Sequence, residues 1–298
     1  MPVANPHPGR PYPPLDWAPL VILPALAIPL RQILAPWLFM WILAVAIFSA
    51  FKWCASRRAI DRRVPATFFR RAAFLFLWPG MDAVRFFDPT CVPEKPLIGE
   101  WLFALAKSAF GAALIWGAAR FAGNGWAAGW IAMVGLIFLL HFGIFHLLAL
   151  FWRRNGIDAR PIMNWPARAH SLGDFWGNRW NAGFSDFAFG LLFTRLAARM
   201  PPRIATLIIF LFSGLIHELV ITFPAGGGYG LPTFYFAIQG AGMLLERSHL
   251  GLRLKLRRTL RGRIFAIGVV TLPIFALFPE AFVLRVMVPF FQIIKAFP

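Results

Sequence analysis

Histidine and glutamate stand side by side within one strongly apolar stretch of this chain. Residues 203–223 read RIATLIIFLFSGLIHELVITF, with His217 and Glu218 in its second half. An ionised carboxylate near the centre of a membrane helix costs on the order of 2.5–3.5 kcal/mol, so Glu218 is expected to face protein or water, or to be neutral. Histidine is the side chain best suited to exchange a proton near neutral pH. The pair therefore marks a candidate site for acid–base chemistry inside a membrane.

Two simpler interpretations of His217 stay open. A single buried histidine often only bonds a neighbouring helix, and Ser213, four residues earlier on the same helical face, is a possible polar neighbour of the imidazole. A metal site is not expected, because HELVI lacks the second histidine of the H-E-x-x-H motif.

A second cluster precedes this stretch, at 174–181, with the sequence DFWGNRWN. Trp176 and Trp180 are four residues apart and are predicted to share one helical face, with Asn181 beside them. Arg179 is a candidate anchor for phosphate or carboxylate. An interfacial aromatic belt would also explain the tryptophans, but the density of Trp, Arg and Asn in one loop favours a site.

The composition indicates which elements must hold these residues. Of 298 residues, 59% are hydrophobic and only 14% are charged, against roughly 25% charged in soluble domains. The mean hydropathy is +0.66. A water-soluble globule of this size could not bury so many apolar side chains, which include 33 Phe and 13 Trp. A soluble enzyme and a disordered chain are thereby excluded, and an integral membrane protein is predicted.

The net charge of +18, from 30 basic and 12 acidic residues, does not indicate nucleic acid here. The basic residues lie in runs between apolar segments, so an anionic leaflet surface is the better partner. Cys54 and Cys91 form neither a disulfide framework nor a metal-ligand pattern.

Apolar length predicts an all-α, polytopic transmembrane helical bundle of about eight spans. The predicted spans are 15–34, 37–53, 101–120, 126–152, 203–223, 231–247, 264–279 and 280–297. The basic segments 52–71 and 247–263 are placed in the cytoplasm by the positive-inside rule. This arrangement puts both chain ends in the cytoplasm.

The whole chain, 1–298, is expected to form a single membrane-embedded domain. Residues 1–14 form a Pro-rich irregular lead-in without the features of a cleaved signal peptide. The segments 68–90 and 184–193 are apolar but short, and are candidate re-entrant or interfacial elements. Within the 126–152 span, His146 is a candidate lining residue of a cavity, or a hydrogen-bonding residue of the bundle.

The two clusters together resemble the membrane-bound O-acyltransferase superfamily. DFWGNRWN, followed about 35 residues later by FLFSGLIHEL, is similar to the signatures F-W-x-x-R-W-N and S-G-x-x-H-E of the wax synthase-like branch. The signature region extends over 153–223. The resemblance implies transfer of an acyl group from acyl-CoA to a hydroxyl, with His217 as catalytic base and Asn181 as the second signature residue. Substrate contacts are expected from Trp176, Arg179, Trp180, Ser213, Glu218 and His146.

By this resemblance, acyl-CoA is a co-substrate, and neither a separate cofactor nor a metal is expected. The acceptor is expected to be a lipophilic alcohol, first of all a long-chain fatty alcohol that gives a wax ester. A sterol, a diacylglycerol or a glycan hydroxyl are alternatives, as is a lipid transporter without enzymatic activity. The expected location is a bacterial inner membrane or, in a eukaryote, the endoplasmic reticulum.

Overall fold

The structure is a computed structural model that describes residues 14–298, so the predicted lead-in lies outside the described residues except for Pro14. Every regular element in the described range is helical, which confirms the all-α prediction. The first half of the chain forms α1 (Pro14–Trp17), α2 (Pro19–Ala27), η1 (Ile28–Gln32), α3 (Pro36–Asp61), α4 (Phe68–Leu77), α5 (Ala83–Phe87), α6 (Ile98–Trp116), η2 (Ala118–Phe121), α7 (Gly125–Leu136), η3 (Ile137–Ile144) and α8 (Phe145–Arg154).

Short helical turns connect this half to the remaining long helices. They are η4 (Pro166–Arg168), α9 (Leu172–Asp174), η5 (Phe175–Arg179), α10 (Ala182–Phe187), η6 (Ala188–Phe193) and α11 (Thr194–Ala197). The last third forms α12 (Pro202–His217), η7 (Glu218–Thr222), α13 (Phe223–Ala225), α14 (Leu231–Arg247), α15 (His249–Arg253), α16 (Leu260–Thr271), α17 (Ile274–Leu277), α18 (Glu280–Phe282), η8 (Val283–Met287) and α19 (Val288–Ile293).

Five of the predicted spans coincide with helices long and apolar enough to cross a membrane. Within the described residues these are Pro36–Asp61, Ile98–Phe121, Gly125–Arg154, Pro202–Ala225 and Leu260–Leu277. Several of them continue through a π-helical or 3₁₀ turn without a break in the helix. The chain is therefore an integral membrane protein with a polytopic helical bundle.

The predicted spans 15–34 and 231–247 form shorter helices. The first becomes the apolar helix Pro19–Gln32, which changes from α to 3₁₀ geometry at Ile28, next to Pro29. A proline removes a backbone donor and disturbs the preceding turn, which explains the change. The second becomes the 17-residue α14, which packs along α12.

The prediction that 280–297 crosses the membrane is wrong. Its start is tied to the loop after α13, since Arg285 donates to the carbonyl oxygens of Ala225 and Gly226, each at 3.3 Å. Its end is tied to η2, since Arg120 donates to the carbonyls of Lys295 and Ala296, each at 2.8 Å. With the basic segments in the cytoplasm, the predicted spans place the loops 121–125 and 224–232 on the opposite side, and both attachment points lie in or next to these loops. The α18–α19 helix therefore lies across the end of the bundle that is predicted to face away from the basic segments, and the C-terminus lies at that end.

Prolines and side-chain caps set the helix ends. Pro36 and Pro202 occupy the first position of α3 and α12, where the missing N–H has no intrahelical partner to lose. Thr67 accepts from the N–H of Arg70 at the start of α4, and Asn124 accepts from that of Ala127 at the start of α7. Gly226, with φ of +62°, ends α13 in the left-handed conformation.

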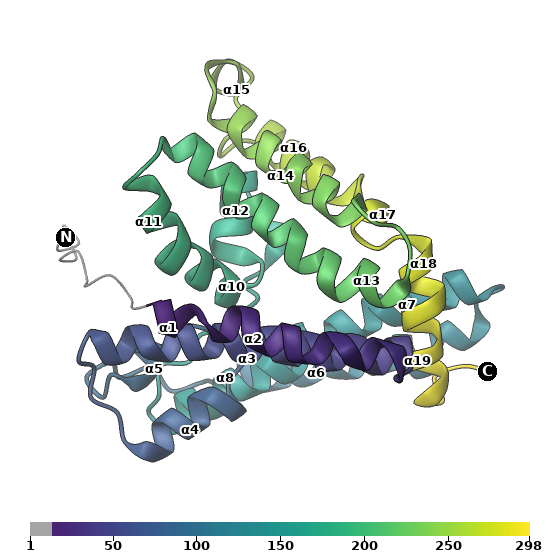
Figure 1. Cartoon of the computed structure of the whole chain (residues 1–298), viewed down its shortest axis with the longest axis horizontal. Helices are drawn as coiled ribbons and strands as arrows, with labels where there is room; N and C mark the ends of the chain where they lie inside the picture. Colours follow the sequence, from purple (N-terminus) through teal and green to yellow (C-terminus); the bar gives the residue numbers. More distant parts are fainter. Residues whose placement is uncertain (1–13) are drawn as a thin grey trace.

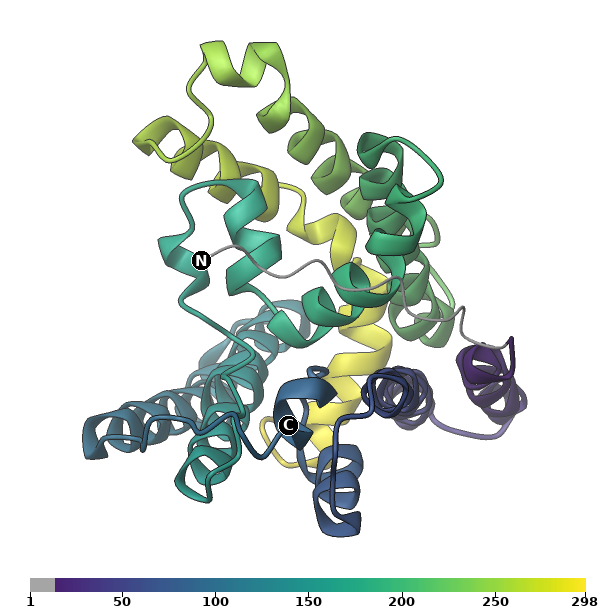
Figure 2. The ribbon, with the colours of Figure 1, turned by 90° about the vertical axis from the view of Figure 1, so that its left-hand side faces the viewer.

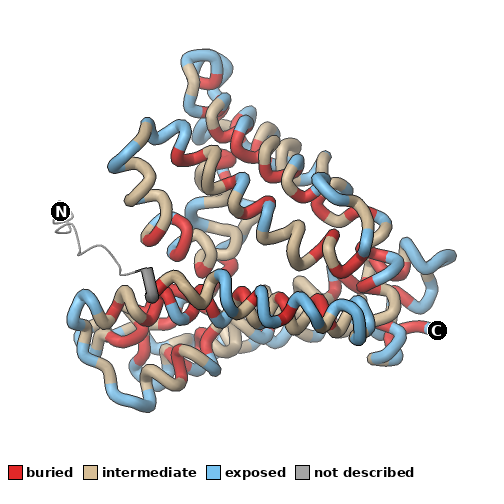
Figure 3. The backbone as a smooth tube through the Cα atoms, in the orientation of Figure 1, coloured by how far each residue is buried: buried red, intermediate tan, exposed pale blue. Residues whose placement is uncertain are grey.

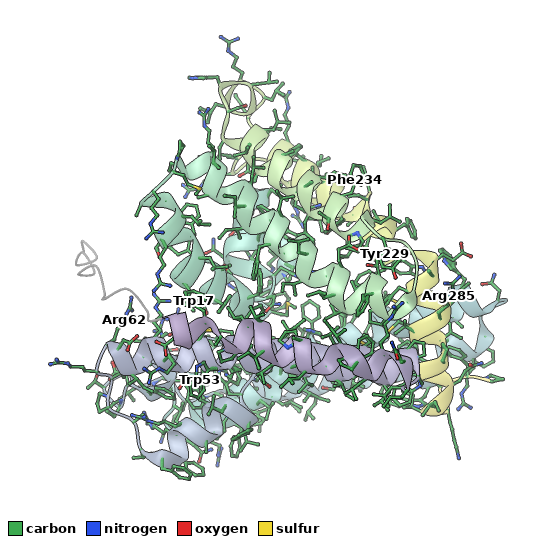
Figure 4. All side chains as sticks on the ribbon, in the orientation of Figure 1. Trp17, Trp53, Arg62, Tyr229, Phe234 and Arg285 are labelled. Atoms are coloured by element: carbon green, nitrogen blue, oxygen red, sulfur yellow. The ribbon has the colours of Figure 1, made fainter. Side chains whose placement is uncertain are left out.

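The helices form two groups that meet at one end of the molecule. Figure 1 shows α2, α3, α6 and α8 in one group and α12, α14 and α16 in the other, with α18 and α19 standing where the groups converge. The segment after α8 lies between the two groups when the molecule is turned (Figure 2). Buried residues gather where helices face one another, as Figure 3 shows, and they form two apolar cores. Figure 4 places Tyr229 and Arg285 near the convergent end, and Trp17, Trp53 and Arg62 at the opposite one.

Candidate functional site

His217 is the last residue of α12, well inside a membrane-spanning helix, and a π-helical turn follows it. Its Nδ1 lies 2.7 Å from the carbonyl oxygen of Ser213. A carbonyl oxygen only accepts, so Nδ1 carries the proton and Nε2 keeps a free lone pair. The ring also packs against Phe236 of α14, with 4.5 Å between centroids. The imidazole is thus held in the tautomer and orientation that a general base requires.

Ser213 is brought to His217, but through its backbone and not through its hydroxyl. The side chain of Ser213 is buried, and no hydrogen bond joins it to the imidazole. The next residue, Gly214, must be small because it packs closely against α14. A Cβ on Gly214 would lie 2.8 Å from the Cα of Thr233, so a larger residue would push α12 away from α14.

Glu218 ties the end of this helix to α14. One carboxylate oxygen accepts from the N–H and the hydroxyl of Thr233, both at 3.0 Å, and the other accepts from the hydroxyl of Thr222 at 2.5 Å. These three hydrogen bonds compensate an ionised carboxylate for much of the hydration that it loses on burial. The structure therefore gives Glu218 a positioning contact next to His217.

The DFWGNRWN segment is a tight turn and not a regular α-helix. Ser171 caps α9 by accepting from the N–H of Asp174, and the chain then winds through the π-helical η5, closed by a bond from Trp180 N–H to Phe175 O at 2.9 Å. The helix ends at Arg179. The prediction that Trp176 and Trp180 share one helical face is wrong, because the helix ends before Trp180. Both rings contact Phe175, but Trp176 also packs against Phe210 and Phe236, whereas Trp180 packs against Phe142.

Trp176 belongs to the surroundings of His217. Its indole N–H donates to Gln239 Oε1 at 3.2 Å, and its ring lies 5.7 Å from that of Phe236 and 6.0 Å from that of Phe210. Phe236 therefore contacts both Trp176 and His217. The two sequence clusters, about 40 residues apart, meet at this phenylalanine.

Arg179 is engaged within its own loop. It donates to Asp174 at 2.5 Å and to the carbonyl oxygens of Asn164 and Trp165. Partial burial opposes ionisation of Asp174, but the bonds from Arg179 and from the His170 N–H hold the pKa of this carboxyl below its usual value. The ion pair closes the loop, so only a part of the guanidinium remains for a ligand.

Asn181 has an unusual backbone and one free donor group. Its φ of +46° is left-handed, a conformation that asparagine tolerates better than most residues. Its Oδ1 caps α10 by accepting from the N–H of Phe184 at 3.2 Å. Its amide NH₂ has no hydrogen-bond partner among residues 14–298.

A cavity of about 1190 Å³ opens beside this segment. Its wall includes Ala182 and Gly183, which follow Asn181, and His146 of α8. His217 is not part of the wall. A run of ring contacts connects the two places and consists of Phe110, Phe138, Phe142, Trp180, Phe175, Trp176, Phe236 and His217, with 4.5–6.4 Å between successive centroids.

The wall of the cavity contains both charged and aromatic residues. The charged residues of the wall are Asp82, Arg85, Glu100, Lys107, Asp158, Arg160 and Asp186. Arg85 is paired with Asp158 at 2.6 Å, whereas the exposed Arg160 makes no hydrogen bond or ion pair in the described chain. Burial raises the pKa of Asp186 to about 6, and the nearby charge of Asp82 adds to this shift.

Sequence reasoning missed Lys107 and Asp186. Lys107 carries a charge in the middle of a predicted span, which is a signal of function in itself. Asp186 gives no such signal in the sequence, because it lies in the short apolar segment 184–193 and not within a predicted span.

Comparison with known proteins agrees with this geometry. Residues 159–237 match the membrane bound O-acyl transferase family, and this range holds Trp176, Asn181, His217 and Phe236. This part of the chain is therefore similar to the membrane-bound O-acyltransferases. Over 73 residues it is 40% identical to the Arabidopsis thaliana protein named "Probable long-chain-alcohol O-fatty-acyltransferase 9", which supports the wax synthase-like branch. The similarity covers 22% of this chain and 21% of the plant protein, so the chain matches about a fifth of that relative's length. Lys107 and His146 lie outside the superfamily match.

Proposed function

We propose that this protein is an O-acyltransferase that moves an acyl group from acyl-CoA to the hydroxyl of a lipophilic acceptor. A long-chain fatty alcohol, giving a wax ester, is the first acceptor to test, because the plant relative is named for that activity. Acyl-CoA is already an activated thioester, so the proposal needs no further cofactor or metal.

The bond from His217 Nδ1 to the Ser213 carbonyl carries this proposal. Nε2 takes the proton of the acceptor hydroxyl while the oxygen attacks the thioester carbonyl carbon. The tetrahedral intermediate then collapses, the C–S bond breaks, and the imidazolium returns the proton to the CoA thiolate. General base catalysis of this kind contributes about 10²–10⁴ in rate.

Besides a general base, the reaction needs a donor that stabilises the oxyanion, and the free amide of Asn181 is a candidate for this role. The thioester oxygen becomes negative in the tetrahedral intermediate, and a fixed donor aimed at it stabilises the transition state. The Asn181 Oδ1 is occupied by the cap of α10, so its NH₂ is directed by the fold. In this proposal Asn181 donates to the oxyanion.

The cavity suits the donor. Its charged residues would hold the phosphorylated portion of CoA. Arg160 is a better candidate for a phosphate contact than Arg179, because Arg179 is already bound to Asp174. Part of this wall belongs to the segment 153–202, which the positive-inside rule places in the cytoplasm with the basic segments, and acyl-CoA would come from that side.

The test uses the full-length protein in nanodiscs with labelled palmitoyl-CoA and four acceptors: hexadecanol, cholesterol, diacylglycerol and a sugar. We expect a labelled ester with hexadecanol, and a loss of about 10²–10⁴ in rate for His217→Ala. His249→Ala is the matched control, because His249 is exposed at the start of α15, in the basic segment 247–263.

Each acceptor outcome is informative. An ester formed only with cholesterol, diacylglycerol or the sugar would keep the acyltransferase and replace the wax ester. No ester and no CoA release above that of His217→Ala would contradict the proposal, and lipid movement unaffected by this substitution would favour a transporter.

A further inference from the structure

Lys107 and His146 form a hydrogen-bonded pair on the wall of the cavity, from two different membrane-spanning helices. Lys107 Nζ of α6 lies 2.8 Å from His146 Nδ1 of α8, and both side chains are half-buried. Lys107 is nine residues beyond Ile98, about 13 Å along the helix at 1.5 Å per residue. An ionisable group at this depth in a membrane is costly unless it has a function or a partner.

The pair presents only donors to the cavity. An ammonium group has three N–H donors and no acceptor, so His146 Nδ1 must accept and His146 Nε2 must carry the proton. The two remaining N–H groups of Lys107 have no hydrogen-bond partner among the described residues. The ammonium also lies 4.4 Å from the ring centre of Phe103, which attracts the cation but accepts no strong hydrogen bond.

Among residues 14–298, no carboxylate forms an ion pair with Lys107. Four acids line the same cavity, at positions 82, 100, 158 and 186. Glu100 is paired with Arg153 at 2.7 Å and Asp158 with Arg85 at 2.6 Å. Asp82 caps α5 by accepting from the N–H of Arg85. Within the described chain, neither Asp82 nor Asp186 lies within ion-pair distance of Lys107.

Aromatic rings extend from the pair into the membrane. Phe110 follows Lys107 by three residues on α6, and Phe142 precedes His146 by four on the facing helix. Phe110 and Phe138 pack edge to face at 4.9 Å, and Phe138 lies 5.2 Å from Phe142. The donors therefore stand at the edge of a wholly apolar surface.

We propose that this pair binds the anionic head group of a long-chain amphiphile, a carboxylate or a phosphate, whose chain lies against Phe110, Phe138 and Phe142. The head group accepts from Lys107 Nζ and from His146 Nε2, and its charge replaces the missing counter-ion. This site needs no catalytic step, so it stands whether or not the chain transfers acyl groups.

The test measures equilibrium binding to the full-length protein in nanodiscs of neutral lipid. The probes are radiolabelled palmitate, hexadecyl phosphate, hexadecanol and inorganic phosphate. We expect palmitate or hexadecyl phosphate to bind at least tenfold more tightly than hexadecanol, and the tighter of the two identifies the head group. Lys107→Met should weaken that binding about tenfold to a hundredfold, since a bond to a charged group is lost.

Matched variants separate this site from general charge effects. Lys107→Arg keeps a cation and should retain most of the binding, and thermal unfolding of each variant reports whether it folds. Lys95→Met removes the same charge from an exposed loop outside the cavity wall and should change nothing. The proposal is overturned by equal binding of hexadecanol, by inorganic phosphate displacing palmitate at comparable concentration, or by equal effects of Lys95→Met and Lys107→Met.

Discussion

The imidazole of His217 is oriented by the backbone carbonyl of Ser213, one turn earlier in the same helix, at 2.7 Å. Residues i and i+4 lie one above the other on the same face of a helix, so the His217 side chain reaches the Ser213 carbonyl within α12 itself. The contact therefore requires no residue from another helix. The π-helical turn that begins at Glu218 then changes the helix geometry directly after the histidine. Such turns are common at functional sites.

This contact makes Ser213→Ala a sharp test of how His217 is held. Because the acceptor is the carbonyl oxygen, we expect Ser213→Ala to change turnover of palmitoyl-CoA by no more than about twofold. His217→Ala should lower it by about 10²–10⁴. The measurement is the initial rate at saturating donor, with thermal unfolding as a check on folding. A loss in Ser213→Ala as large as that in His217→Ala would mean that the hydroxyl itself takes part.

Asn181→Asp separates the two parts of the Asn181 amide. Aspartate is as good a helix cap as asparagine and tolerates the left-handed backbone, so α10 should keep its start. The substitution removes the NH₂ donor, and we expect kcat to fall about 10²–10³-fold with little change in thermal stability. Asn124→Asp is the control, because Asn124 caps α7 through the same kind of bond at 2.8 Å. Normal turnover in Asn181→Asp would leave Asn181 with the cap alone.

Glu218→Gln should lower stability more than it lowers chemistry. The carboxylate joins α12 and η7 to α14 through Thr222 and Thr233. Loss of its charge weakens three bonds at once, and a cost of about 1–3 kcal/mol in unfolding free energy is expected. The melting temperature in nanodiscs checks this, with the exposed Glu280→Gln as control. An unchanged melting temperature together with lost activity would instead indicate a direct role for Glu218 in the reaction.

The sequence predicts the helices well but not the last one. Apolar length locates five spans, because hydrophobic matching to the bilayer is a local property. The 280–297 segment has the composition of a span, but α18–α19 is bound at both ends to outer loops by Arg285 and Arg120. Those bonds join residues about 60 and 175 positions apart, and no local pattern contains them.

In the candidate site, too, local sequence patterns predict some features, whereas others depend on contacts between distant residues. His217 and Asn181 can be predicted as site residues from the sequence because a motif records residue type and spacing. The different directions of Trp176 and Trp180 depend on a π-helical turn, which has no clear sequence pattern. The Lys107–His146 pair depends on two helices that face each other across 39 positions of sequence.

The position of α18–α19 predicts that the C-terminus is accessible from the side opposite the basic segments. The experiment places single cysteines, Pro298→Cys or Arg253→Cys, in a Cys54→Ala, Cys91→Ser background and labels them with a membrane-impermeant maleimide. In sealed vesicles of one orientation, we expect only one of the two positions to react, and the other only after the membrane is opened. Labelling of both from the same side would restore the topology with both ends in the cytoplasm.

The carboxyl of Asp186 predicts a pH dependence at the cavity. Its pKa is raised to about 6 by burial and by Asp82, against about 3.9 in an unfolded chain. The folded state thus holds this proton more tightly, so its contribution to stability is greatest at low pH and falls as pH rises from about 4 to 6. Above pH 6 the cavity also carries one more negative charge, which repels the phosphates of acyl-CoA. We therefore expect the KM for palmitoyl-CoA to rise between pH 5 and 7.

Asp186→Asn should remove this rise while leaving kcat near its wild-type value, because the amide cannot ionise and Asp186 is not assigned to the chemical step. It should also stabilise the protein more at pH 7.5 than at pH 4.5, which thermal unfolding at the two pH values measures. Asp61→Asn provides the comparison, since Asp61 is an exposed carboxyl at the end of α3 and outside the cavity wall. A pH profile of KM that is identical in the wild type and in Asp186→Asn would show that another group controls access of the donor.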